Sequence, residues 1–170
     1  MSTLGTIYVN YLGDIDRAIP WFEKSLKINP TYEIARFNLI FCYKKKNLTE
    51  LAISLYEKMI DEGTKKTPIY FDLHELYLSK KEYDTSIEMN KKILLEHPEE
   101  IKLYINLGNA YMLKEETVEG LKYFEIAAQK LPLDYVLLQN VANVFRTVGD
   151  EKKALYYEIM SKTARTQFEK

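Results

Sequence analysis

The chain has 170 residues, of which 46% are hydrophobic and 29% are charged, with a net charge of −1. This composition excludes a disordered chain, and only 6 glycines and 5 prolines leave little material for a turn-rich all-β fold. Nucleic-acid binding needs a concentrated Lys/Arg surface, so the balanced charge argues against a nucleic-acid partner. The single cysteine, Cys42, cannot form an internal disulfide, and no apolar run reaches the length of a membrane span. We therefore expect a cytoplasmic helical protein with no membrane partner.

Apolar residues follow helical spacing in successive segments that are separated by short breaks. In chain order, helices are expected over residues 3–12, 14–28, 33–46, 48–62, 67–80, 82–96, 101–114, 116–130, 135–148 and 150–165. The short breaks pair these helices into five helix-turn-helix units. No segment requires a strand.

The five units repeat with a period of 34 residues. Large residues of one helical face recur at Tyr43, Tyr77, Tyr111 and Phe145. Small residues recur at Ala18, Ala52, Ser86, Gly120 and Ala154, and turn positions recur at Gly13, Asn47, Lys81, Glu115 and Gly149. A fixed period between 20 and 50 residues is typical of stacked repeats. The period predicts a single domain over residues 1–170, with repeats at 1–32, 33–66, 67–100, 101–134 and 135–168.

The fourth unit resembles the tetratricopeptide repeat (TPR) family. The residues that carry the resemblance are Tyr104, Leu107, Gly108, Tyr111, Gly120, Phe124, Ala127 and Pro132. The same pattern extends over essentially the whole chain. It implies an all-α fold, a right-handed superhelical solenoid of five TPR-like helix-turn-helix repeats. It also implies a protein-binding scaffold or adaptor.

Three positions depart from the family pattern. His74 stands where the fourth and fifth units have the small residues Gly108 and Ala142. Asn90 and Glu158 stand where other units have an aromatic ring. Losing an aromatic side chain from a core costs a few kcal/mol. We therefore expect the loosest packing around the third repeat.

The chain offers little material for catalysis. It has two histidines, His74 and His97, one cysteine and no glycine-rich phosphate loop. His74 lies between leucines on a helix, which is typical of a core or interface imidazole. We therefore expect no enzyme, no cofactor and no metal site.

A row of polar residues follows the first helices, which form the inner wall of such a solenoid. One register holds Asn38, Asp72, Asn106 and Asn140, and the register three residues further along holds Glu75, Asn109 and Asn143 after Phe41. Asparagine is a poor helix former, so a row of it in mid-helix needs a reason. A carboxamide can pair with the backbone N–H and C=O of an extended peptide. The row therefore predicts that an extended segment of a partner protein binds on the concave face.

Charged residues beside this row predict the charges of the ligand. Asp72 and Glu75 are acidic, whereas Lys102 and Arg146 are basic. We expect a ligand with a Lys or Arg near the third repeat and a carboxylate near the fourth and fifth repeats.

Two alternatives remain open at this stage. The chain could be a structural scaffold subunit of a larger assembly that uses its convex face or open ends, or a regulatory fragment of a larger protein. The last helix carries the apolar residues Leu155, Tyr156, Ile159 and Met160 without a complete further helix to cover them. They predict self-association through this uncapped helix.

Overall fold

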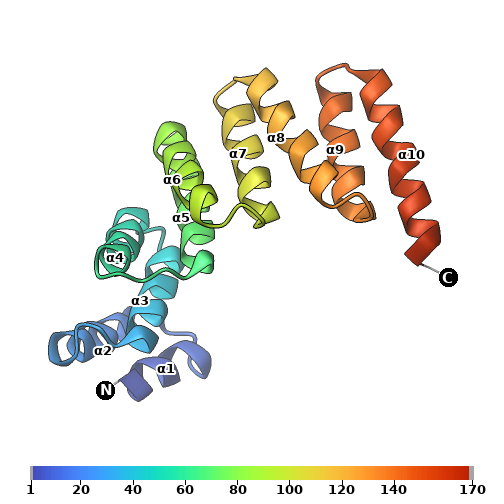
Figure 1. The fold of residues 1–170 in the computed structure, drawn as a ribbon. Coiled ribbons are helices and arrows are strands. Elements are labelled where there is room, and N and C mark those ends of the chain that lie inside the picture. The colour runs from blue at the N-terminus through green and yellow to red at the C-terminus, as the bar shows by residue number, and fades with distance from the viewer. Residues whose placement is uncertain (1, 169–170) are drawn as a thin grey trace. The chain divides into compact units, whose positions relative to one another are not determined.

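A computed structural model describes residues 2–168, and every regular element within that range is an α-helix. The helices alternate along the chain as the first and second helix of each repeat, joined by a short turn (Figure 1). The helices are α1 (Ser2–Asn10), α2 (Ile15–Ile28), α3 (Glu33–Lys45), α4 (Thr49–Asp61), α5 (Thr67–Ser79), α6 (Tyr83–Glu96), α7 (Ile101–Leu113), α8 (Thr117–Lys130), α9 (Tyr135–Thr147) and α10 (Glu151–Phe168). The predicted fold class, an all-α array of five helix-turn-helix repeats, is confirmed, and the expected helix ends differ by at most a few residues.

The turn inside every hairpin contains one residue in the left-handed region. The φ angles are 63° at Gly13, 56° at Asn47, 62° at Lys81, 68° at Glu115 and 82° at Gly149. These are the five turn positions that the 34-residue period picks out. A left-handed residue ends a helix by letting the chain fold back onto the last free carbonyl groups.

The first hairpin is one residue longer than the others. In the second to fifth hairpins, the N–H after the left-handed residue bonds a carbonyl five residues back, as in Glu116 to Tyr111 at 2.9 Å. In the first, Asp14 bonds Tyr8, six residues back, also at 2.9 Å. The sequence period therefore shifts by one within α1, and Gly5 takes the place that Gly108 has in the fourth repeat.

The helices form two compact units, one ending at Ile69 and the other beginning at Tyr70, and we describe each by itself. In the first unit, α1 packs on α2, α2 on α3, and α3 on α4. Its core includes Phe22, Leu39, Tyr56 and Met59, all less than 5% exposed.

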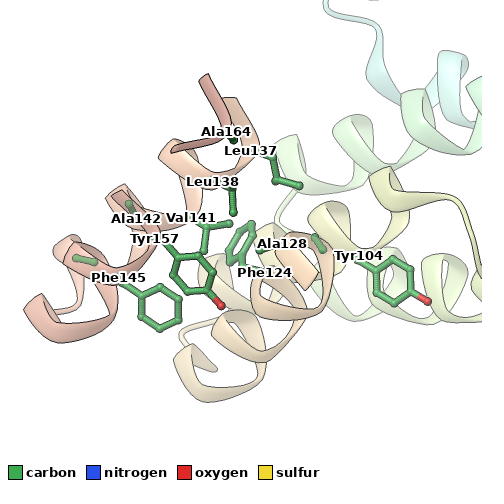
Figure 2. Close-up of a cluster of buried hydrophobic side chains, with 12 residues drawn as sticks. Tyr104, Phe124, Ala128, Leu137, Leu138, Val141, Ala142, Phe145, Tyr157 and Ala164 are labelled. Atoms are coloured by element: carbon green, nitrogen blue, oxygen red, sulfur yellow. The ribbon is translucent and has the colours of Figure 1, made fainter. Parts of the chain in front are cut away.

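In the second unit, α7 packs on α8, and α9 packs on α10. The main core of this unit lies between α8, α9 and α10 (Figure 2). The rings of Phe145 and Tyr157 stack there with centroids 5.6 Å apart.

Small and large side chains are matched where the two helices of a repeat cross. A Cβ atom on Gly108 would lie 2.9 Å from the ring of Phe124, and one on Gly5 would lie 2.7 Å from the ring of Phe22. In the third repeat, the larger His74 stands at the glycine position and the smaller Asn90 at the aromatic position, and both are fully buried. In the third repeat the larger side chain of the pair is therefore on the first helix and the smaller one on the second.

Candidate functional site

The first helices of the second unit expose several of the predicted polar residues. Asn109 on α7 and Asn140 and Asn143 on α9 are exposed, and Asn109 and Asn143 occupy the same register of their repeats. All three lie in the interior of a helix, where no cap or turn requires an amide. Their side chains are therefore accessible to a ligand.

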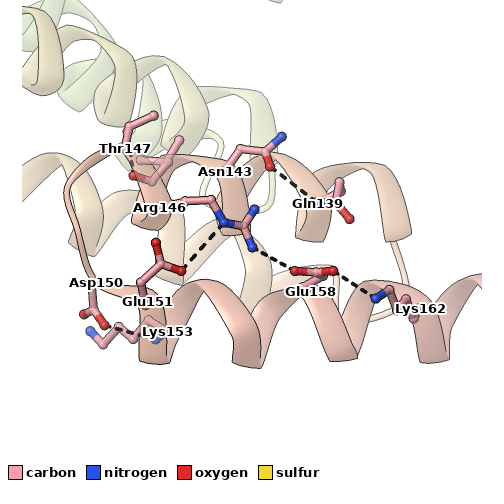
Figure 3. A network of polar contacts seen from close by, with 10 residues as sticks. Gln139, Asn143, Arg146, Thr147, Asp150, Glu151, Lys153, Glu158 and Lys162 are labelled. Atoms are coloured by element: carbon pink, nitrogen blue, oxygen red, sulfur yellow. Dashed lines mark hydrogen bonds and ion pairs between the residues drawn. The ribbon is translucent and has the colours of Figure 1, made fainter.

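On α9 the amides continue into a network of charged side chains (Figure 3). Gln139 Nε2 donates to Asn143 Oδ1 at 3.4 Å. One turn further, the Arg146 guanidinium donates to Glu158 Oε2 at 2.8 Å, and its Nε lies 3.8 Å from a Glu151 carboxylate oxygen. Arg146 is therefore already paired with carboxylates of α10, and it offers a ligand little net positive charge.

Hydrogen bonds from two cations stabilise the ionised form of Glu158. Lys162 Nζ donates to Glu158 Oε1 at 2.9 Å, and Arg146 donates to the other oxygen. The bond from Lys162 and then that from Arg146 hold the pKa of Glu158 below its usual value. Glu158 stands at an aromatic position of the repeat, and here it binds α10 to α9 by charge.

Asn106 lies away from the solvent, which differs from the prediction that it contributes to the binding face. It is 3% exposed, and its Nδ2 donates to Asn90 Oδ1 at 3.3 Å. The bond joins α7 to α6. Because this side chain is buried and paired, it cannot also pair with a peptide without leaving its place in the core.

Asn90 belongs to a buried polar cluster that includes His74 and Ser86. Its Nδ2 donates to the Ser86 carbonyl at 2.8 Å and lies 3.2 Å from His74 Nδ1, and Ser86 Oγ lies 2.6 Å from the same nitrogen. Both Ser86 Oγ and Asn90 Nδ2 therefore lie within hydrogen-bond distance of His74 Nδ1. No hydrogen-bond partner for Nε2 is found among the described residues. The cluster joins α5 to α6 within the third repeat.

Burial keeps the His74 ring neutral. Desolvation, and then the positive charge of Lys102, lower the pKa of His74 to about 4. The imidazole is therefore uncharged at neutral pH. The expectation that His74 is a core imidazole is confirmed by its full burial.

The remaining predicted site residues lie on three helices. Lys102 on α7 is exposed, with its ammonium 4.2 Å from the centroid of the Phe71 ring. On α5, Glu75 is exposed and Asp72 is half-buried. Asn38 is half-buried on α3 in the first unit, and its position relative to the other site residues is not defined.

Three of the four apolar residues singled out on the last helix are exposed. Leu155, Tyr156 and Ile159 are 57%, 57% and 56% exposed. Met160 is half-buried and packs against the core of the second unit. The exposed α10 patch therefore consists of Leu155, Tyr156 and Ile159 without Met160.

The described residues show no arrangement typical of a metal centre. Between residues 2 and 168, no group of three or more His, Cys, Asp or Glu side chains could hold a metal ion. Burial raises the pKa of the Cys42 thiol to about 11, so the thiol is protonated at neutral pH. No helix in the described range is both long and apolar enough to cross a membrane.

Two features of the surface were missed in the sequence. Gln139 extends the amides of α9, and it stands at a register that other repeats fill with Phe37, Phe71 and Ile105. A polar residue at a register that is apolar in the other repeats is the sequence signal that could have identified Gln139 as part of the surface. Phe41 is 43% exposed, and the polar residues 34 positions apart at Glu75, Asn109 and Asn143 signal that this register faces solvent.

Comparison with known proteins agrees with this architecture. A tetratricopeptide repeat family model matches residues 2–32, which contain α1 and α2. A comparison with curated protein sequences finds no match.

Solved structures extend the similarity to the whole chain. A crystal structure of MamA is 20% identical with a TM-score of 0.75, covering 96% of this chain and 95% of that one. MamA from Desulfovibrio magneticus RS-1 is 13% identical with a TM-score of 0.74, covering 97% and 93%. YrrB, described as a TPR protein with an unusual peptide-binding site, is 13% identical with a TM-score of 0.66, covering 96% and 84%. The chain therefore carries a recognisable tetratricopeptide repeat at its first hairpin and has the fold of tetratricopeptide-repeat proteins.

Proposed function

We propose that the chain is a non-catalytic protein-interaction module that binds an extended peptide segment of a partner protein. The observation that carries this proposal is the exposure of Asn109 and Asn143 at one register of successive first helices, with Asn140 beside them. Each asparagine costs some tenths of a kcal/mol of helix stability relative to alanine. Neither the core nor a helix cap uses these amides, so a ligand is the simplest reason for them.

The chemistry of the amides suits peptide backbone. A carboxamide presents two N–H donors and a carbonyl acceptor, which complement the C=O and N–H groups of an extended chain whatever its side chains are. The similarity in fold to YrrB, a TPR protein described as having a peptide-binding site, supports the same kind of ligand.

Side-chain selectivity would come from charges next to the amides. Asp72 and Glu75 favour a basic ligand residue, and Lys102 favours a carboxylate. Arg146 contributes less than its charge alone indicates, because Glu158 and Glu151 already neutralise it. Each such surface pair adds up to about 1 kcal/mol.

The test is affinity capture from cell lysate with quantitative mass spectrometry. The wild-type chain is compared with Asn109→Ala/Asn143→Ala, after both show equal helicity and melting temperature. Gln129→Ala on α8, which is also exposed, is the matched control. Loss of the captured partners by the double variant and not by the control supports the proposal. Equal capture by all three proteins rejects this surface as the binding site.

A second candidate is a structural subunit that associates through α10. The exposed α10 patch of Leu155, Tyr156 and Ile159 favours it, because three adjacent apolar side chains on one helix are costly to leave in water. Sedimentation equilibrium over increasing concentration tests it. Self-association that is abolished by Leu155→Asp/Ile159→Asp would support this candidate, and a monomer at every concentration would count against it.

A further inference from the structure

The first unit presents an apolar surface of a different kind on α3. Ile34, Phe37 and Phe41 follow one another at spacings of three and four, which places them on one face of this helix. Ile34 is 57% exposed, Phe41 is 43% exposed, and Phe37 is half-buried. We call these three residues the α3 stripe. It is about 10 Å long, since a helix rises 1.5 Å per residue.

The repeat fold does not require an apolar residue at the end of this stripe. The positions equivalent to Phe41 in the next three repeats are Glu75, Asn109 and Asn143, and all three are exposed and polar. The other repeats therefore fold with a polar residue at this register, and the fold does not require a phenylalanine there. Leaving such a ring in water sacrifices free energy that contact with an apolar ligand would recover.

Lysine side chains surround the stripe. The ammonium of Lys45 lies 5.5 Å from the centroid of the Phe41 ring, and that of Lys66 lies 6.0 Å from the centroid of the Phe37 ring. Lys66 also bonds both carboxylate oxygens of Glu33 at 2.7 Å. At the C-terminal end of α3, Lys44, Lys45 and Lys46 follow one another, and Lys46 pairs with Asp16 at 2.7 Å. The ammonium placed next to Phe41 is therefore that of Lys45, whereas Lys46 and Lys66 are paired with carboxylates.

We propose that the α3 stripe binds a protein segment that carries large apolar side chains next to carboxylates. The apolar side chains would cover Ile34, Phe37 and Phe41, and a carboxylate would pair with Lys45 beside Phe41. Both contacts reinforce each other, because an apolar ligand excludes water from the ion pair. This inference rests on the proposed peptide-binding function and deepens it, because it assigns a defined ligand chemistry to the first-unit member of the same first-helix register.

Aromatic rings with lysines can also stack on the bases of single-stranded nucleic acid. The net charge of −1 and the pairing of Lys46 and Lys66 with carboxylates favour the acidic protein segment. Nucleic-acid binding is therefore kept as an outcome of the test.

The test selects ligands from a displayed library of random 12-residue peptides against the full chain. Selected peptides are synthesised, and their affinities are measured by fluorescence anisotropy. We expect enrichment of Leu, Ile or Phe together with Asp or Glu. Phe41→Asn is the diagnostic variant, since asparagine is the native residue at this register in two other repeats. It should weaken binding about tenfold or more.

Leu51→Asn on α4 is the matched control, because Leu51 is exposed to a similar extent, 48%, and it should change affinity less than about twofold. Lys45→Glu should weaken the same peptides. Selected peptides without acidic residues, or with unchanged affinity for Phe41→Asn, would overturn the inference. So would Phe41-dependent binding of an oligouridylate probe.

Peptides that depend on Asn109 and Asn143 but not on Phe41 would leave the proposed function standing and reject the α3 stripe alone. Failure to select any peptide would reject both.

Discussion

His74 and Asn90 meet in the core of the third repeat, where His74 Nδ1 lies 3.2 Å from Asn90 Nδ2. The equivalent helix crossing in the fourth repeat packs Gly108 against Phe124. The large side chain is thus on the first helix in the third repeat and on the second helix in the fourth. The space between the helices stays filled, and a hydrogen-bonded polar contact replaces an apolar one. The two positions therefore form one packing unit.

This exchange predicts strong coupling between the two positions. His74→Gly alone should leave a cavity and cost about 2–5 kcal/mol of the free energy of unfolding. Asn90→Phe alone should overpack the crossing and cost about 1–3 kcal/mol. The double variant recreates the pair of the fourth repeat, so it should cost at least about 1 kcal/mol less than the sum of the single changes. Urea denaturation followed by circular dichroism measures the cycle.

Two substitutions at residues that are not in contact provide the control for this double-mutant cycle. Asn90→Phe combined with Gly149→Ala, in the last hairpin, should give additive losses within about 0.5 kcal/mol. Additivity for His74 and Asn90 as well would show that the two side chains do not share one space.

The buried imidazole predicts that acid weakens the fold. The folded-state pKa of His74, about 4, lies below the usual histidine value of 6.5, so the unfolded chain takes up a proton first as the pH falls. Stability from the neutral ring is complete above pH 6.5 and is lost as the pH falls from there towards 4. Between pH 7 and pH 5, the loss should be about 2 kcal/mol.

NMR titration of the ring protons checks the assignment. His97 is exposed and is the only other histidine, so His97→Gln leaves a spectrum of His74 alone. His74→Gln should remove most of the stability loss between pH 7 and pH 5. A His74 signal that titrates near pH 6.5 would contradict the account.

Helices and turns were predictable because each depends on short-range periodicity that five units repeat. The positive φ angles at Lys81 and Glu115 could be predicted because these residues share the register of Gly13 and Gly149, although lysine and glutamate do not favour that conformation. The shift by one residue in the first hairpin was not predictable from the period, since an added turn residue leaves α2 in register and moves only α1.

Exposure within the polar row was harder to predict. Asn106 and Asn140 share one register, yet Asn106 is buried and Asn140 is exposed. The difference comes from the preceding helix: Asn106 on α7 donates to Asn90 on α6, whereas the position equivalent to Asn90 before Asn140 is Phe124 on α8, which has no hydrogen-bond acceptor. A pattern on one helix cannot show which partner a neighbouring helix provides.

A buried charge in the first unit makes Glu62 important for stability. Arg36 is 3% exposed, its Nε donates to the Pro30 carbonyl at 2.6 Å, and its guanidinium pairs with Glu62. Glu62→Gln leaves this buried cation without a counter-charge. The loss should be about 2 kcal/mol, below the usual range for a broken buried pair because Glu62 is partly exposed. Differential scanning calorimetry measures it, with Glu57→Gln, an exposed change on α4, as the comparison.

The left-handed turn residues predict a stabilising substitution. Glu115 has a φ of 68°, where a side chain costs about 1–2 kcal/mol, whereas glycine adopts this conformation freely. Glycine also gives the unfolded chain more freedom, which costs about 0.5–1 kcal/mol. Glu115→Gly should therefore raise the free energy of unfolding by about 0.5–1 kcal/mol.

The reverse change at the equivalent position is the matched control for Glu115→Gly. Gly149 has a φ of 82°, and a Cβ there would meet no atom within 4 Å. Gly149→Ala thus tests backbone conformation without a steric clash, and it should lower stability by a similar amount. Thermal and urea unfolding of the two variants decide the matter. If both changes shift stability in the same direction, backbone conformation does not control these turns, and the side chain of Glu115 must contribute through another contact.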